Sequence, residues 1–161
     1  MDESPNIYKN ARRASGLTQE RWAELLGISA EAVRQYETDR ILPSDTIALR
    51  MAEAAGQTIV CYWHMLNKSR VAAELLPEVE EVPLPQAVLQ LLRRMRDFDK
   101  RHRLDDLLTI AEDGVVDEQE RPDFDAIVSE LMDLFGAAMS VKFSQGAGKE
   151  KAGGSRQEQG G

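Results

Sequence analysis

Residues 18–37 read TQERWAELLGISAEAVRQYE, a pattern typical of two short helices joined by a tight turn. Thr18 and Ser29 stand where helix N-caps are needed, because their hydroxyls accept hydrogen bonds from free backbone amides. Gly27 suits the end of the first helix, since glycine enters the left-handed conformation at little cost. Val33 and Tyr36 are expected to point inward from the second helix. Together these residues predict a helix-turn-helix.

A unit of this size needs further helices to enclose its apolar side chains. Runs of alternating β-branched residues are absent, so almost everything else is predicted to be helical. We expect helices near 5–15, 18–26, 29–37, 44–55 and 58–68, which form an all-α, five-helix domain over residues 1–70. The flanking apolar positions that would complete its core are Ile7, Ala11, Leu17, Ile47, Met51, Ala54, Ile59 and Trp63.

Residues 5–68 resemble the Cro/CI-type, or XRE, helix-turn-helix family. The matching motifs are RxxGLTQE from Arg13, AExxGIS from Ala23 and VxxYE from Val33, followed by Arg40, Pro43 and LxxA from Leu49. The resemblance implies a lambda-repressor-like fold and a sequence-specific DNA-binding domain whose helix 29–37 lies in the major groove. It departs from the family at Trp22, which replaces a smaller aliphatic residue and is expected to reach further across the core. It also departs at Asp39, where glycine is usual, although aspartate tolerates a positive φ better than most residues.

The resemblance also implies which residues read DNA bases. Gln19 begins the first motif helix, where the family contacts the phosphate backbone or an outer base. The outward face of helix 29–37 is expected to carry Ala30, Glu31, Arg34 and Gln35. Glutamine pairs with adenine, arginine with guanine, glutamate accepts from cytosine, and an alanine methyl contacts a thymine methyl. Arg40 and Arg21 are expected to contact phosphates, which position the protein without specifying sequence.

Charge is divided unevenly along the 161-residue chain, which has 20 Lys+Arg against 28 Asp+Glu and a formal charge of −8. Residues 1–70 hold nine basic and nine acidic side chains, whereas residues 71–145 hold eight and 17. Phosphate neutralisation supplies most non-specific DNA affinity. A domain of net charge zero therefore predicts modest affinity for one copy, and a homodimer would double the contacts. No signal segment is visible, so we expect a cytoplasmic protein.

The second half is predicted to be a separate helical unit. The segment PEVEEVPLP, Pro77 to Pro85, predicts a linker over 71–85, because proline breaks helices and carboxylates repel one another. Helices are expected near 86–101, 104–113 and 118–142 in an acidic unit over 86–143, and 144–161 is predicted to be a disordered tail. Helix 118–142 has a long apolar stripe, which predicts contact with a second copy or with another protein.

Three further features have both a functional and a structural interpretation. The first is a basic cluster whose functional interpretation is a second DNA or partner patch: Arg93, Arg94, Arg96, Lys100, Arg101 and Arg103. The i,i+4 spacing of its arginines to aspartates favours a solvated face with salt bridges. Residues 109–120 weakly resemble a calcium loop, yet Thr109 and Ala111 stand where carboxylates are required. Asp117 and Glu120 are better explained as a capping box.

The third feature is Cys61, the single cysteine, one turn before His64. It excludes an intrachain disulfide and a cysteine-based zinc finger, and packing explains the pair better than a metal site. We find no set of catalytic residues, so no enzyme, metal or cofactor is predicted. Two functions remain: a DNA-binding transcriptional regulator of repressor or antitoxin type, and a protein-interaction adaptor that uses the helix-turn-helix as a scaffold. A sensor that binds a small molecule in its helical half is a third, weaker hypothesis.

Overall fold

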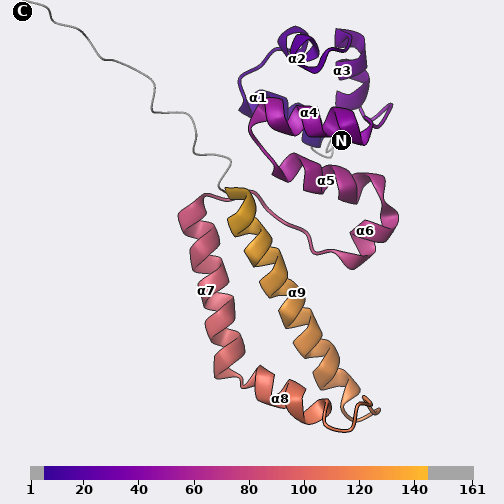
Figure 1. Ribbon diagram of the computed structural model, residues 1–161. Helices are drawn as coiled ribbons and strands as arrows, with labels where there is room; N and C mark the ends of the chain where they lie inside the picture. The colour runs from indigo at the N-terminus through magenta and orange to yellow at the C-terminus, as the bar shows by residue number, and fades with distance from the viewer. Residues whose placement is uncertain (1–5, 145–161) are drawn as a thin grey trace, which may run out of the picture. The chain divides into compact units, whose positions relative to one another are not determined.

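The structure is a computed structural model that describes residues 6–144, and within that range every regular element is an α-helix (Figure 1). It divides into two compact units, one ending at Lys68 and one spanning Ser69–Ser144. The predicted all-α fold class is confirmed. The predicted tail begins at residue 144, so all but its first residue lies outside the described residues. None of the described helices is long and apolar enough to cross a membrane.

The first unit consists of five helices. These are α1 (Ile7–Ala14), α2 (Gln19–Leu26), α3 (Ala30–Glu37), α4 (Asp45–Ala55) and α5 (Ile59–Lys68). The sequence places each of them to within two residues. Side chains cap four of the helices, as their N-cap residues Asn6, Thr18, Ser29 and Ser44 each accept a hydrogen bond from a backbone amide in the first turn. Short polar side chains therefore fix where these helices begin.

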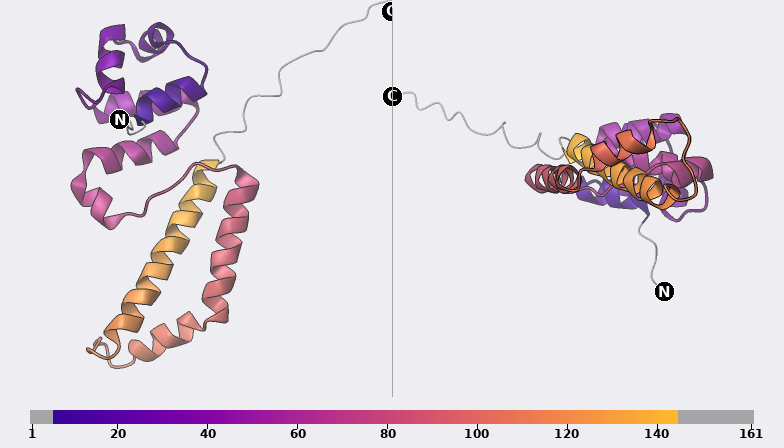
Figure 2. Two further views of the ribbon diagram at one scale, coloured as in Figure 1. Left: turned by 180° about the vertical axis from the view of Figure 1, so that it is seen from behind. Right: turned by 90° about the horizontal axis from the view of Figure 1, so that it is seen from below.

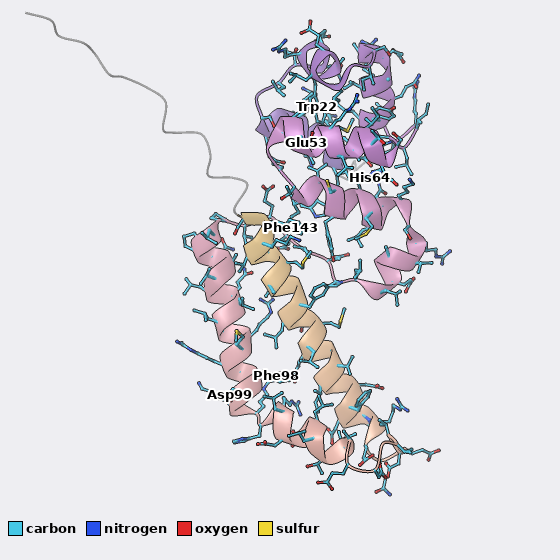
Figure 3. All side chains as sticks on the ribbon, in the orientation of Figure 1. Trp22, Glu53, His64, Phe98, Asp99 and Phe143 are labelled. Atoms are coloured by element: carbon cyan, nitrogen blue, oxygen red, sulfur yellow. The ribbon has the colours of Figure 1, made fainter. Side chains whose placement is uncertain are left out.

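The core of this unit is formed by α1 to α5 around Trp22, whose side chain is fully buried (Figure 3). The other buried members of the cluster are Tyr8, Ala11, Ala23, Leu26, Val33, Met51, Ala52 and Val60. Of the predicted core residues, Ala11, Met51 and Ile59 are buried, whereas Ile7, Leu17, Ile47 and Ala54 pack on its edge. Trp63, also predicted for the core, is half-buried. Sequence periodicity missed Tyr8, because an aromatic side chain that also has a polar group can lie inside or on the surface.

The second unit contains the four remaining helices. These are α6 (Arg70–Leu75), α7 (Leu84–Lys100), α8 (Arg103–Ile110) and α9 (Arg121–Ser144). Helices α7 and α9 run antiparallel beside each other, and α8 joins them at one end (Figure 2). Their shared cluster has three buried members, Phe98, Ile110 and Ile127. Asp117 and Glu120 form the predicted capping box: Asp117 Oδ1 accepts from the Glu120 amide, and Glu120 Oε2 accepts from the Asp117 amide.

The segment between residues 71 and 85 is more structured than a free linker. Helix α6 occupies residues 70–75, at its beginning, and Val79 is 5% exposed. A β-carbon added to Gly136 of α9 would lie 3.4 Å from the Pro77 side chain and 3.6 Å from the Glu78 carbonyl oxygen. Both are ordinary van der Waals distances for a β-carbon, so the proline-rich segment packs directly against α9 at a position that does not require glycine. Burial also raises the pKa of the Glu81 carboxyl.

The prediction of i,i+4 salt bridges along α7 is wrong for the described residues. Arg93, Asp97 and Asp99 form no ion pair there, whereas Arg101 and Arg103 both contact Glu130 of α9, at 3.2 and 3.0 Å. Cross-helix pairing replaces the i,i+4 pairing because α8 turns the chain back and brings the half-buried Glu130 within reach of both guanidinium groups, and Arg103 also lies 3.6 Å from Asp106 one turn along α8. The three arginines Arg93, Arg94 and Arg96 remain exposed, with no carboxylate within salt-bridge distance among residues 6–144.

Candidate nucleic-acid interface

The turn between α2 and α3 sets the orientation of α3 relative to α2. Gly27 has φ +65°, and the Ile28 amide donates to the Ala23 carbonyl at 3.0 Å, which closes α2 with a left-handed cap. Ser29 follows at once, and its hydroxyl accepts from the Ala32 amide at 3.1 Å. Because the stop of one helix and the start of the next are only two residues apart, the crossing of α2 and α3 is closely fixed.

Helix α3 has one buried side and one exposed side. Val33 and Glu37 are buried, whereas the Glu31 and Arg34 side chains are 57% and 52% exposed. Arg34 donates to Glu31 Oε2 through Nε at 3.0 Å and Nη2 at 2.8 Å, and Gln35 Nε2 is 3.4 Å from Glu31 Oε1. Three predicted base-reading residues thus form one connected cluster, with Glu31 and Arg34 exposed and Gln35 half-buried. The hydrogen bond from Arg34 lowers the pKa of the Glu31 carboxyl, so Glu31 stays ionised beside it.

The other two predicted base readers have different surroundings. Ala30 is half-buried and packs against the core cluster. Gln19 is also half-buried, and its Nε2 donates to Glu37 Oε2 at 2.7 Å. Gln19 is thus held at the beginning of α2 by the last residue of α3. Its amide has a structural partner that the sequence did not indicate.

Sequence reasoning assigned no role to Arg12 or Glu37, yet they form the main buried ion pair of the unit. Arg12 donates to both carboxylate oxygens of Glu37, and its Nη1 donates to the Leu17 carbonyl at 2.7 Å. The two side chains are 11% and 3% exposed. The hydrogen bonds to Glu37 raise the pKa of Arg12. The one available signal was position, because Glu37 follows Val33 by four residues and therefore shares its buried side of α3.

The two predicted phosphate contacts are exposed. Arg21 donates to Glu24 one turn along α2 at 2.7 Å, a pair whose two side chains are both more than half exposed. Such pairs contribute little stability, so Arg21 can exchange Glu24 for another anion. Arg40 follows α3, and its backbone amide donates to the Gln35 carbonyl at 3.0 Å. Its side chain forms no ion pair among residues 6–144.

Asp39 shapes the turn that carries Arg40. It has φ +55°, in the left-handed region that glycine enters most easily. Asn6 Nδ2 donates to Asp39 Oδ1 and to the Tyr36 carbonyl, each at 2.7 Å. The aspartate at this position keeps the turn because its side chain gains a hydrogen bond that glycine cannot form.

His64 belongs to a polar network at the junction of α1, α4 and α5 (Figure 3). Its Nδ1 lies 2.7 Å from the Tyr8 hydroxyl and its Nε2 lies 3.1 Å from Asp45 Oδ1, which also accepts from Lys68 Nζ at 2.6 Å. Burial raises the pKa of Tyr8 to about 12. With both ring nitrogens occupied, His64 has a structural role, and no cluster of three metal-binding side chains occurs among the described residues.

A family model described as helix-turn-helix matches residues 9–60. This segment belongs to the XRE, or Cro/CI-type, helix-turn-helix family. The match confirms the family resemblance that the sequence motifs carry, and it covers less than half of the chain. Helix-turn-helix proteins of this type are DNA-binding regulators rather than enzymes. Comparison with curated proteins and with solved structures found no match.

Proposed function

We propose that this chain is a sequence-specific transcriptional regulator, of repressor or antitoxin type, that places α3 in the major groove of DNA. The observation that supports this most directly is the outward cluster of Glu31, Arg34 and Gln35 on a helix capped by Ser29. A helix of eight residues presented by a rigid turn is the element that this motif inserts between the two DNA backbones.

The cluster has the chemistry for direct base readout. Arg34 pairs with guanine, Gln35 with adenine, and Glu31 accepts from cytosine. Glu31 already holds Arg34 in the free protein, so the guanidinium is oriented along the outer face of α3. Ala30 and Gln19 are the remaining proposed readers. Gln19 would reach an outer base or phosphate only with the part of its amide that Glu37 leaves free.

Arg21 and Arg40 are the proposed phosphate contacts, and their exposure supports this role. Residues 1–70 have equal numbers of acidic and basic side chains, so a single domain gains little from neutralising phosphates. We therefore propose that two copies bind a two-fold site whose half-sites lie about one helical turn apart. Two domains on one site double the base and phosphate contacts.

The test is selection of bound fragments from a genomic DNA library by the full-length chain, followed by footprinting of the recovered sites. A regulator gives a discrete palindromic footprint whose affinity falls as salt rises. The double variant Arg34→Ala, Gln35→Ala should lose the footprint, while the control Arg70→Ala, an exposed arginine of α6, should keep it.

The competing function is a protein-interaction adaptor, for which the net charge of zero in the first 70 residues is the specific support. An adaptor would select no discrete site. Equal affinity for all recovered and random duplexes would contradict the regulator proposal.

A further inference from the structure

The second unit has a small core for the amount of apolar surface it carries. Its cluster has three buried residues, Phe98, Ile110 and Ile127. Large apolar side chains of α7 and α9 remain exposed nearby: Leu89, Leu92 and Met95 on α7, and Val128, Leu131 and Phe135 on α9. Contiguous exposed apolar surface of this kind marks an interaction site.

The exposed apolar residues of α7 lie to one side of its buried line. Ala87 and Phe98 mark the buried side of this helix. At about 100° per residue, Met95 and Leu92 are turned from that side by roughly 70° and 130°, in the same direction. They are 52% and 43% exposed.

The same relationship holds on α9. Ile127 and Leu134 belong to the shared cluster, and they mark its inner side. Leu131, Phe135 and Val128 are turned from that side by roughly 50°, 90° and 110°, again in the same direction. They are 36%, 40% and 38% exposed.

These two apolar strips share one face of the α7/α9 pair. The helices run antiparallel (Figure 2), so an equal sense of rotation on each brings both strips to the same side. The two strips also lie at the same level along the helix pair. Phe98 and Ile127 pack in one cluster. Because the helices are antiparallel, the residue six positions before Phe98 on α7 lies level with the residue about six positions after Ile127 on α9. Leu92 is therefore level with residue 133, about two residues (~3 Å) from Phe135 along α9, and we call this surface the apolar face.

Charge indicates what covers the apolar face. Residues 84–100 carry four basic and two acidic side chains, whereas residues 121–144 carry two basic and four acidic ones. In the described chain, the basic side chains of α7 form no ion pair, and neither do Asp123, Asp125 and Asp133 of α9. By the same 100° per residue, Arg96 of α7 and Asp125 of α9 border the apolar strips, each turned from the inner side of its helix by roughly 170° in the same direction. An unpaired basic group and an unpaired acidic group therefore flank this face.

We propose that the apolar face binds the same face of a second copy, with α7 of each chain packed against α9 of the other. A two-fold axis parallel to the helices produces this pairing and preserves height, so Leu92 meets Phe135 across the interface. The result is a four-helix bundle in which each helix is antiparallel to its neighbours and opposite to them in net charge. The inference names the interface of the dimer in the proposed function and rests on that function for its biological use.

The first experiment measures the mass of the full-length chain without DNA by sedimentation equilibrium. The expected mass of the wild type is twice the 18.0 kDa of one chain. Leu92→Glu and Phe135→Glu should each give the single-chain mass, while the control Leu75→Glu, on a more exposed leucine of α6, should stay dimeric. Circular dichroism verifies that each variant keeps its helical content.

Cross-linking tests the pairing itself in a Cys61→Ala background, which removes the chain's single cysteine. Chains carrying L92C, mixed with chains carrying F135C, should form a covalent dimer on mild oxidation, and neither variant alone should do so. Cross-linking of either variant with itself would overturn the pairing, and a monomeric wild type would overturn the interface. A dimer that selects no DNA site would refute the proposed function alone, whereas a monomer that protects a site would refute only this interface.

Discussion

Arg12 of α1 and Glu37 at the end of α3 lie 25 residues apart and form a two-pronged ion pair, with Nη2 3.0 Å from Oε2. The same carboxylate accepts from Gln19 at the beginning of α2. The buried carboxylate of Glu37 therefore links α1, α2 and α3 at the C-terminal end of the proposed recognition helix. The orientation of α3 depends on this contact as well as on the turn at Gly27.

Removing the arginine should destabilise the first unit strongly. Arg12→Ala leaves the Glu37 carboxylate buried with Gln19 as its remaining side-chain partner, and uncompensated buried charge costs about 3 kcal/mol or more. Urea denaturation followed by circular dichroism measures the loss. The matched control is Arg13→Ala, an exposed arginine on the same helix, which should change the stability by less than about 0.5 kcal/mol. Equal stability of the two variants would show that the ion pair contributes nothing.

The left-handed residue after α3 gives a second prediction. Asp39→Ala loses the acceptor of Asn6 and places a side chain without local hydrogen bonding at φ +55°. We expect a loss of about 1–2 kcal/mol in the free energy of unfolding. Asp39→Asn keeps a carbonyl oxygen for Asn6 and tolerates this backbone conformation, so it should remain close to the wild type. Thermal unfolding of both variants distinguishes the two, and an Asn variant as unstable as the Ala variant would contradict the explanation.

Base-reading and phosphate-contacting residues should respond differently to substitution. Gln35→Ala should relax preference at one base position, at a cost of about 1–3 kcal/mol on the specific site and little on random DNA. Arg40→Ala should weaken binding to all sequences alike and reduce the salt slope by about 1. Fluorescence anisotropy on specific and random duplexes over a range of salt concentrations measures both. The assignments fail if the two variants lose the same affinity on both kinds of DNA.

The Asp45 carboxyl should titrate below its usual range, because hydrogen bonds from Lys68 and His64 lower its pKa. Lys68→Met should therefore raise that pKa, as followed by carbon NMR of the carboxyl group. Since the folded-state pKa is lowered, the interaction stabilises the fold above the unfolded-state pKa and is lost as pH falls through the folded one. The difference in stability between the wild type and Lys68→Met should accordingly vanish in acid. An unchanged Asp45 titration in the variant would exclude this role for Lys68.

The helices of the first unit and the helix-turn-helix motif could be predicted from the sequence alone, because local patterns determine them. Thr18, Gly27 and Ser29 act on amides within a few residues, so their effect is readable without knowledge of the rest of the fold. The exposed positions of Glu31 and Arg34 followed equally from the inward direction of Val33.

Contacts between distant residues were decided only by the tertiary structure. Nothing in the sequence paired Arg12 with Glu37, Tyr8 with His64, or Arg103 with Glu130, because each pair is separated by more than 20 residues and meets only once the helices cross. The close approach of Pro77 to Gly136 and the common side of the strips on α7 and α9 likewise depend on how helices pack. Hydrogen bonds and periodicity within one helix are short-range and repeat along the chain, whereas the choice of partner across helices depends on their packing in three dimensions.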